Sequence, residues 1–204
     1  MNDFEKSLAG YIGAENLERI QGVKIGIGGA GGLGSNCAFN LVRSGFKHFV
    51  IVDFDKIEYS NLNRQFYFSE QVGQAKVLAL KDNLLKINPD LEVEAIVERV
   101  SSDNISRFFD DSDVIVEAFD EVKSKKLIVE QYVNSDKFLV SASGLAGWGN
   151  TDQIQTKRFN DKFYIVGDFI TEINDDNPPL SPRVNIVAAK QADLILEAVL
   201  EGRI

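Results

Sequence analysis

The sequence is poor in the residues that build covalent links and metal centres. Its 204 residues include one cysteine and one histidine, and only four are proline. The lone cysteine, Cys37, makes neither an internal disulfide nor a four-cysteine zinc site, so we expect it to be a small packing residue. The lone histidine, His48, begins an apolar run, and we expect it to be structural or solvent-exposed. No Ser–His–Asp set is evident.

Positive charge and long apolar runs are also scarce. The 22 Lys and Arg residues are outnumbered by 31 Asp and Glu residues, which gives a formal net charge of −9. This balance argues against nonspecific binding to nucleic acid or to an anionic membrane. No apolar run approaches the roughly 20 residues that span a bilayer, and residues 1–21 lack the features of a signal peptide. We therefore expect a soluble, cytoplasmic protein.

Short apolar runs alternate with helix-like periodic segments along most of the chain. Strand patterns occupy residues 23–27, 49–52, 91–97, 114–116 and 138–140, and helical patterns occupy residues 36–44, 74–88 and 123–134. This alternation predicts an α/β fold with a doubly wound, mainly parallel, Rossmann-like sheet. Two further strand patterns, 153–156 and 163–166, predict a C-terminal antiparallel addition.

No linker or internal repeat divides the sequence, so we expect one domain over residues 1–204. Residues 1–21 are predicted to form an N-terminal helical extension. Residues 168–182 are acidic and hold three of the four prolines, which predicts an exposed loop. Residues 185–200 are predicted to form a final amphipathic helix.

A glycine-rich loop, Gly29-x-Gly31-x-x-Gly34, follows the first predicted strand and opens the first predicted helix. Glycines there allow a tight turn and close approach to a phosphate, and the helix N-terminus offers unpaired N–H groups. Asp53 ends the next strand, about 20 residues on, where a carboxylate can hold ribose hydroxyls. Together these features predict a nucleotide site. The P-loop pattern is missing, and the loop leaves open whether the nucleotide is a dinucleotide or ATP.

The polar segment after Asp53 bears on that choice. Arg64 offers a planar fork for phosphate oxygens, Asn61 adds an amide nearby, and Lys76 adds a compact positive charge. A triphosphate needs such groups, and a dehydrogenase of this fold does not. Asp120 ends a central strand at the ligand-binding edge and is a candidate for Mg²⁺. Read alone, Lys76 fits a solvent-exposed helix position, and Asp120 fits a helix N-cap equally well.

Several motifs come in an order that resembles the superfamily of ubiquitin-activating-type enzymes. They are Gly-x-Gly-Gly-Leu-Gly-Ser (29–35), Asp-x-Asp (53–55), Ser-Asn-Leu-Asn-Arg-Gln (60–65), Val-Gly-Gln-Ala-Lys (72–76), Ile-Asn-Pro (87–89) and Asp120. The resemblance covers roughly residues 23–145 and is strongest to the bacterial adenylyltransferases that activate ubiquitin-like sulfur carriers. Residues 143–149 and 181–184 look like a short ThiF-type subfamily of thiamine biosynthesis.

The resemblance implies an enzyme that uses ATP and Mg²⁺ to adenylate the C-terminal glycine carboxylate of a carrier protein ending in Gly-Gly, releasing pyrophosphate. The catalytic residues it implies are Arg64, Lys76 and Asp120, with Asp120 positioning Mg²⁺. The implied nucleotide-binding residues are Gly29, Gly31, Gly32, Asp53, Ser60, Asn61, Arg64, Lys76 and Asp120. A carboxylate is already ionised near neutral pH, so this chemistry needs no general base.

The sequence also departs from the resembled family. It has no Cys-x-x-Cys pairs, so we predict no zinc site, and it has no downstream cysteine, so a separate sulfur donor protein is expected. In the resembled family an arginine near the N-terminus is often supplied to the site of the partner subunit. The usual Arg-Tyr-x-Arg-Gln run is missing here. Arg19 is a weak substitute that we expect to be solvent-exposed, although a homodimer is still expected.

Three other interpretations stay open. The same fold with ATP fits a dehydratase of a carboxylated tRNA base, against which the acidic charge weighs. A NAD-binding oxidoreductase fits the glycine loop and Asp53 but leaves Arg64 and Lys76 unexplained. A nonenzymatic nucleotide-sensing or scaffold protein is the fourth possibility.

Overall fold

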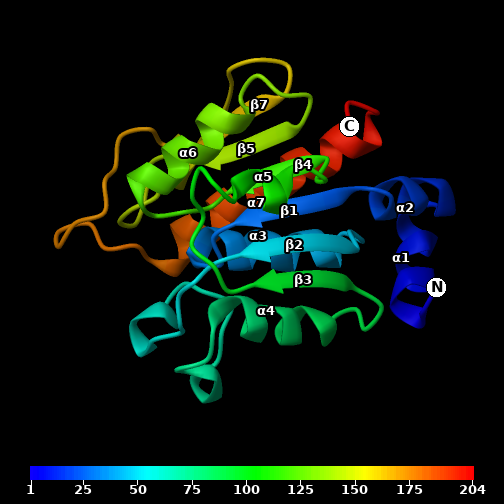
Figure 1. Cartoon of the computed structure of the whole chain (residues 1–204), viewed down its shortest axis with the longest axis horizontal. Helices are drawn as coiled ribbons and strands as arrows, with labels where there is room; N and C mark the ends of the chain where they lie inside the picture. The colour runs from blue at the N-terminus through cyan, green and yellow to red at the C-terminus, as the bar shows by residue number, and fades with distance from the viewer.

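A computed structural model describes residues 1–204 and contains a single seven-stranded sheet with the order β3-β2-β1-β4-β5-β7-β6. Neighbouring strands are parallel from β3 through β7, and β6 is antiparallel to β7 (Figure 1). This arrangement confirms the predicted doubly wound, mainly parallel fold. The strands are β1 (Lys24–Gly28), β2 (His48–Val52), β3 (Glu92–Ile96), β4 (Val114–Glu117), β5 (Phe138–Ala142), β6 (Gln155–Arg158) and β7 (Phe163–Gly167).

The C-terminal antiparallel addition is present, with one refinement. β7 pairs in parallel with β5 and continues the main sheet, so the antiparallel part is the single edge strand β6. All four residues of β6 are exposed, and two of them, Lys157 and Arg158, are basic. Charged side chains of this kind discourage another chain from pairing with a free sheet edge.

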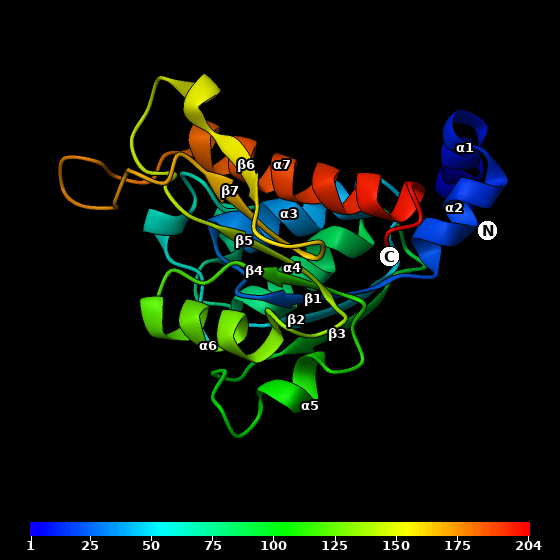
Figure 2. The ribbon, with the colours of Figure 1, turned by 90° about the horizontal axis from the view of Figure 1, so that it is seen from above.

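Helices cover both faces of the sheet. They are α1 (Asp3–Ile12), α2 (Ala14–Gln21), α3 (Gly32–Arg43), α4 (Lys76–Leu85), α5 (Ile105–Phe109), α6 (Val122–Tyr132) and α7 (Ser181–Leu200). Figure 2 shows α3 and α7 on one face and α5 and α6 on the other. None of these helices combines the length and the apolar character needed to cross a membrane.

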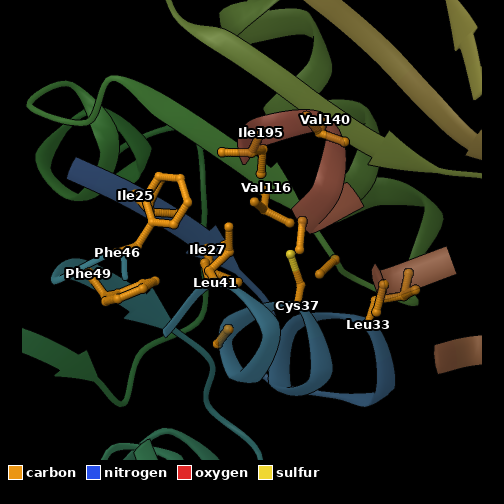
Figure 3. Close-up of a cluster of buried hydrophobic side chains, with 14 of the residues drawn as sticks. Ile25, Ile27, Leu33, Cys37, Leu41, Phe46, Phe49, Val116, Val140 and Ile195 are labelled. Carbon is orange, nitrogen blue, oxygen red and sulfur yellow. The ribbon is translucent and has the colours of Figure 1, made fainter. Parts of the chain in front are cut away.

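Strands in the interior of the sheet send alternate side chains to two separate apolar clusters, as β2 illustrates. On β2, Phe49 and Ile51 join the larger cluster beneath α3, α4 and α7, while Val50 and Val52 join the smaller one beneath α5 and α6. Cys37 lies in the larger cluster, beside Leu41 of the same helix (Figure 3). Burial raises the pKa of its thiol to about 12, so Cys37 is the packing residue that we expected.

Candidate functional site

The candidate site lies at the carboxyl ends of β1, β2 and β4. The chain runs outward from β1 to β2 and β3, and then returns to place β4 on the other side of β1. Open α/β sheets bind ligands outside the strand ends at such a switch point. The glycine loop follows β1, Asp53 follows β2 and the turn 118–120 follows β4, so the topology brings these three segments together.

Glycine is required at two positions of the loop. Gly29 has φ +100, and a Cβ there would lie 2.7 Å from the carbonyl oxygen of Ala118. A Cβ on Gly34 would lie 1.8 Å from the carbonyl oxygen of Gly29, where no side chain fits. Helix α3 then begins at Gly32, and its N-cap, Gly31, makes no side-chain cap hydrogen bond. The backbone donors of this first turn are therefore the type of group that binds an anion.

Asp53 is a buried carboxylate held on both oxygens. Oδ2 accepts a hydrogen bond from the backbone N–H of Ala30 (2.7 Å), and Oδ1 accepts one from the N–H of Asp55 (2.8 Å). Burial raises the pKa of Asp53, and these two donors and Lys76 act against that rise. Each oxygen keeps a second lone pair, so this fixed carboxylate can also accept hydrogen bonds from ribose hydroxyls.

The segment that carries Arg64 is tied to the first turns of α3. The Asn36 side chain donates to the carbonyl oxygens of both Gly32 (2.7 Å) and Arg64 (2.8 Å). A Cβ on Gly32 would lie 3.4 Å from Cγ of Arg64, so the arginine stem lies against the glycine loop. Burial lowers the pKa of the Arg64 guanidinium, and the negative charge of Asp120 opposes this decrease.

Ser60 and Asn61 shape the turn before Arg64. The Arg64 guanidinium donates to the carbonyl oxygen of Ser60 (3.0 Å), and the exposed Ser60 hydroxyl interacts with Glu58 (3.3 Å). Asn61 Oδ1 accepts from the N–H of Glu58 (3.0 Å), which closes the 3-10 turn Tyr59–Asn61. In the described contacts these two residues orient Arg64, and the amide nitrogen of Asn61 is left to donate to a ligand.

Lys76 begins α4 and is buried, in contrast to a solvent-exposed helix position. Its side chain is 8% exposed, and Nζ lies 2.8 Å from Oδ2 of Asp55. The positive charge of Lys76 also opposes the rise that burial causes in the pKa of Asp53. Lys76 therefore belongs to the same electrostatic cluster as Asp53, and this cluster joins β2 to α4.

Asp120 is exposed in the turn between β4 and α6. The N-cap of α6 is Glu121, so Asp120 does not serve the N-cap role that its position also suggested. No group of three His, Cys, Asp or Glu side chains that could hold a metal ion occurs in the chain. Mg²⁺ is commonly bound through one or two carboxylates together with water and phosphate oxygens, and Asp120 fits that kind of site.

Two features near the site escaped the sequence analysis. Tyr67 is buried, and its hydroxyl donates to the carbonyl oxygen of Ala30 (2.6 Å) in the glycine loop. Glu117, the last residue of β4, is fully buried and pairs with Lys125 of α6. A carboxylate that ends an apolar strand, as Asp53 also does, was a usable signal for Glu117. Nothing local marked Tyr67.

The loop 168–182 is exposed over most of its length but is anchored at both ends. Asp168 is buried and pairs with the buried Arg183, which also donates to the carbonyl oxygen of Gly149 (2.6 Å). Asp168 is thus a structural anchor, which corrects the expectation of an exposed loop at that residue. Helix α7 begins at Ser181, four residues before the expected start at 185, so the last two residues of the predicted loop are helical.

The fold defines a Rossmann-like α/β protein in which an uncapped helix N-terminus and several charged side chains lie together at the strand ends of the switch point. The sequence pattern of the ThiF family matches residues 4–199, and the chain belongs to this family.

Curated relatives share this part of the sequence. The chain is 34% identical over 139 residues to SUMO-activating enzyme subunit 2 of Dictyostelium discoideum, covering 67% of this chain and 21% of the relative. It is 34% identical over 137 residues to the tRNA threonylcarbamoyladenosine dehydratase of Bacillus subtilis (66% and 54%). It is 35% identical over 130 residues to the sulfur carrier protein adenylyltransferase of Thermus thermophilus (63% and 48%). The matched segment thus spans about a fifth to about half of these relatives.

Solved structures show the same fold over nearly the whole chain. The E. coli tRNA N6-threonylcarbamoyladenosine dehydratase in complex with ATP superposes with a TM-score of 0.88 at 19% identity, covering 97% of this chain and 94% of that one. E. coli MccB, solved with AMPCPP and MccA, superposes with a TM-score of 0.72 at 20% identity over 97% of this chain and 61% of that one. The named relatives differ in what they act on, so they show the family without singling out the thiamine subfamily.

Proposed function

We propose that the chain binds Mg-ATP at the carboxyl edge of the sheet and adenylates a carboxylate. The acceptor in this proposal is the C-terminal glycine of a ubiquitin-like sulfur carrier protein. One observation supports it above the others: the stem of Arg64 lies against the open first turn of α3, at the same sheet edge where Asp120 follows β4. A guanidinium, an uncapped helix N-terminus and a carboxylate for Mg²⁺ are the groups that a triphosphate needs.

In the proposed reaction a carboxylate oxygen of the acceptor attacks the α-phosphorus of ATP. The bond from that phosphorus to the bridging oxygen breaks, and the bridging oxygen leaves with its electron pair as part of pyrophosphate. Bound Mg²⁺ would neutralise phosphate charge from the side of Asp120. Arg64 and Lys76 would neutralise charge from the other elements, and Asp53 would hold the ribose. The step depends on alignment and charge neutralisation, which fixed groups supply well.

The finer proposal places the protein in the thiamine branch of the family, on the resemblance of residues 143–149 and 181–184. A separate protein would donate sulfur, because the buried Cys37 cannot reach a carrier. The relative from Thermus thermophilus, named a sulfur carrier protein adenylyltransferase, supports a carrier as the acceptor. The whole-chain domain, the homodimer and the cytoplasmic location belong to the same proposal.

Pyrophosphate exchange tests the reaction directly. With Mg-ATP, labelled pyrophosphate should enter ATP only when a carrier ending in Gly-Gly from the same genome is present. Arg64→Ala should abolish exchange. Arg107→Ala, which removes an exposed arginine of α5 that pairs with Glu98, should leave exchange intact. Exchange that survives Arg64→Ala would contradict the phosphate assignment, and no exchange with any such carrier would contradict the acceptor.

A second candidate keeps ATP and changes the acceptor to a carboxylated tRNA base. The 34% identity to the Bacillus subtilis dehydratase favours it. The formal net charge of −9 weighs against tight tRNA binding. AMP release that depends on the modified tRNA, and not on any carrier, would establish this second candidate in place of the first.

A further inference from the structure

An ion pair between the fully buried Glu117 and Lys125, whose side chain is 26% exposed, lies next to the turn that carries Asp120. Glu117 ends β4 and is fully buried, and its carboxylate lies 2.9 Å from Nζ of Lys125, which projects from α6. The hydroxyl of Ser141, on the neighbouring strand β5, donates to the same carboxylate. The three side chains therefore join two strands and a helix at the edge where the proposed ATP site lies.

The two side chains of the pair form hydrogen bonds with both the backbone N–H and the carbonyl oxygen of Phe119. The N–H of Phe119 donates to Oε1 of Glu117 (2.9 Å), and its carbonyl oxygen accepts from Nζ of Lys125 (2.9 Å). Phe119 is the residue immediately before Asp120. Because both of its polar backbone groups are fixed by one ion pair, the point from which Asp120 departs is fixed as well.

The same turn also packs closely against the end of β1 and the start of the glycine loop. A Cβ on Gly29 would lie 2.7 Å from the carbonyl oxygen of Ala118, and a Cβ on Gly28 would lie 2.8 Å from the ring of Phe119. A movement of residues 118–119 would therefore displace the loop that is proposed to hold the phosphates. The ion pair thus acts on the proposed metal ligand and on the phosphate loop together.

Stability alone does not explain this pair. An ion pair with a fully buried carboxylate is often no more stabilising than apolar residues of similar volume, because the cost of desolvating that charge offsets the attraction. Here each charge also contacts the backbone of the turn, and the neighbouring Asp120 has no ion pair or hydrogen bond of its own among the contacts of the structure. The lysine further neutralises Glu117, which would otherwise be an unpaired negative charge three residues before Asp120.

We propose that Glu117, Lys125 and Ser141 are positioning residues that fix the turn from which the Asp120 carboxylate would bind Mg²⁺. This inference depends on the proposed function, since it assumes that Mg-ATP binds at this edge. It adds that the affinity for Mg²⁺ depends on an ion pair that contacts neither the metal nor the nucleotide.

The test is a Mg²⁺ titration of ATP binding, followed with a fluorescent ATP analogue and without any acceptor. Lys125→Gln should raise the Mg²⁺ concentration at half-saturation by about tenfold or more, as is typical when an outer-shell partner of a metal ligand is removed. Binding of the analogue in EDTA should change little. Lys126→Gln is the matched control, because Lys126 is the next residue of α6 and pairs only with the exposed Glu130.

A double-mutant cycle identifies the route of the effect. Asp120→Asn should itself raise the half-saturating Mg²⁺ concentration, and adding Lys125→Gln to Asp120→Asn should raise it little further, because the pair acts through Asp120. Effects of the two substitutions that multiply would show that the pair acts elsewhere and would overturn the inference.

If the Lys125→Gln variant does not fold, the Ser141→Ala variant and hydrogen exchange test the same inference. Ser141→Ala should raise the Mg²⁺ requirement by a smaller factor, and exchange of the amides of residues 118–121 should become faster in it without ligand. If the wild type binds Mg-ATP but the half-saturating Mg²⁺ concentration is unchanged in both Lys125→Gln and Ser141→Ala, the inference is overturned. A wild type that binds no Mg-ATP overturns the proposed function instead.

Discussion

At the scale of single residues, the site is marked by charges that are buried before any ligand arrives. The Lys76 ammonium is almost fully covered and has one carboxylate partner, Asp55. A charge removed from water is costly unless it is paired, so the protein bears that cost only where the charge has a use or a strong partner. Asp55 is 42% exposed, and it can release part of the ammonium to an incoming phosphate.

Lys76→Met tests this interpretation. It removes the charge, keeps the apolar stem, and leaves Asp53 and Asp55 without a neutralising cation. We expect the Kd for Mg-ATP to rise about tenfold or more, because a hydrogen bond to a charged group contributes about 1.5–3 kcal/mol. Lys86→Met, at the exposed C-cap of the same helix, should leave the Kd unchanged. Calorimetric titration with Mg-ATP measures both variants, and equal affinities in the two would remove Lys76 from the site.

Tyr67 supports the glycine loop from below. Burial raises the pKa of its hydroxyl well above the usual 10, and the nearby negative charge of Asp53 adds to this, so the hydroxyl remains a donor to Ala30 throughout the neutral range. Tyr67→Phe should lower the free energy of unfolding by about 1–2 kcal/mol, because the hydrogen bond is lost and the carbonyl of Ala30 is left without that donor. Urea unfolding at neutral pH measures the change. An unchanged midpoint would mean that the loop finds another donor.

At the scale of elements, Arg183 and Asp168 join three segments that are far apart in the sequence. Arg183 lies in the first turn of α7, Asp168 follows β7, and the carbonyl oxygen of Gly149 belongs to the loop after β5. The N–H groups of Ile170 and Thr171 also donate to Asp168, each at 2.8 Å. The two loops beside the candidate site are therefore held by one buried ion pair.

Arg183→Met should destabilise the protein by about 3–5 kcal/mol, because it leaves Asp168 as a buried charge without its cation. Urea unfolding near neutral pH measures this loss. Arg158→Met, which removes a largely exposed pair with Asp161, should change stability by less than about 1 kcal/mol. Similar effects of the two substitutions would show that the Asp168 pair does not anchor the loops.

The same variant should respond differently to acid. Burial alone raises the pKa of Asp168, but the donors from Thr171 and Ile170 and the charge of Arg183 outweigh it, so the pKa lies below its usual 3.8. A carboxyl of this kind contributes stability that is present above 3.8 and is lost as the pH falls through the lower folded value. Arg183→Met raises the folded pKa, so this part of the acid destabilisation should move to higher pH. Circular dichroism during acid titration detects the shift.

The predicted elements follow from apolar patterns, and the errors occur where such patterns stop. The parallel strands are short apolar runs or, in β3, an alternation of polar and apolar residues, and each predicted range lies within two residues of the observed bounds. The start of α3 was placed at residue 36, four residues late, because Gly32-Leu33-Gly34-Ser35 has no helical periodicity. The five-residue α5 is too short to show any period and was not predicted. The Asp168–Arg183 pair has no sequence pattern at all, since it depends on where β7 and α7 are packed.

At the scale of the whole molecule, the sequence identified the strand-end groups and missed what supports them. Gly29, Asp53 and Asp120 each follow a predicted strand, so a parallel sheet is enough to bring them to one edge. That Arg64 lies against Gly32, and that Lys76 is buried beside Asp55, depends on how the segment 54–75 folds back over α3. This segment has no regular periodicity, and side-chain hydrogen bonds to α3 fix its path, such as the one that Ser35 accepts from the N–H of Phe66 (3.0 Å). Sequence patterns alone place Arg64 in a loop and Lys76 in a helix, and they do not determine the direction of either side chain.

The N-terminal helices lie far from the candidate site, which leads to a prediction about Arg19. Figure 1 shows α1 and α2 at the end of the sheet opposite the strand tips that carry the site. Arg19, on α2, lies 2.6 Å from Glu15 on the same helix, and its side chain is half exposed. Arg19 therefore does not reach the site of its own chain, and as an exposed helix pair it contributes little stability.

We expect Arg19→Ala to leave pyrophosphate exchange within about twofold of wild type and stability within about 0.5 kcal/mol, as is usual for surface substitutions. Arg64→Ala, measured in the same assay, gives the scale of a true loss. If Arg19→Ala loses exchange while its urea midpoint is unchanged, the arginine must act in the site of a second copy. Mixing Arg19→Ala with Arg64→Ala protein would then restore part of the exchange, because some mixed dimers would contain one site with both arginines. If the site is built within one chain, Arg19→Ala alone should show the exchange of the wild type. Adding Arg64→Ala protein to it should then produce no further exchange.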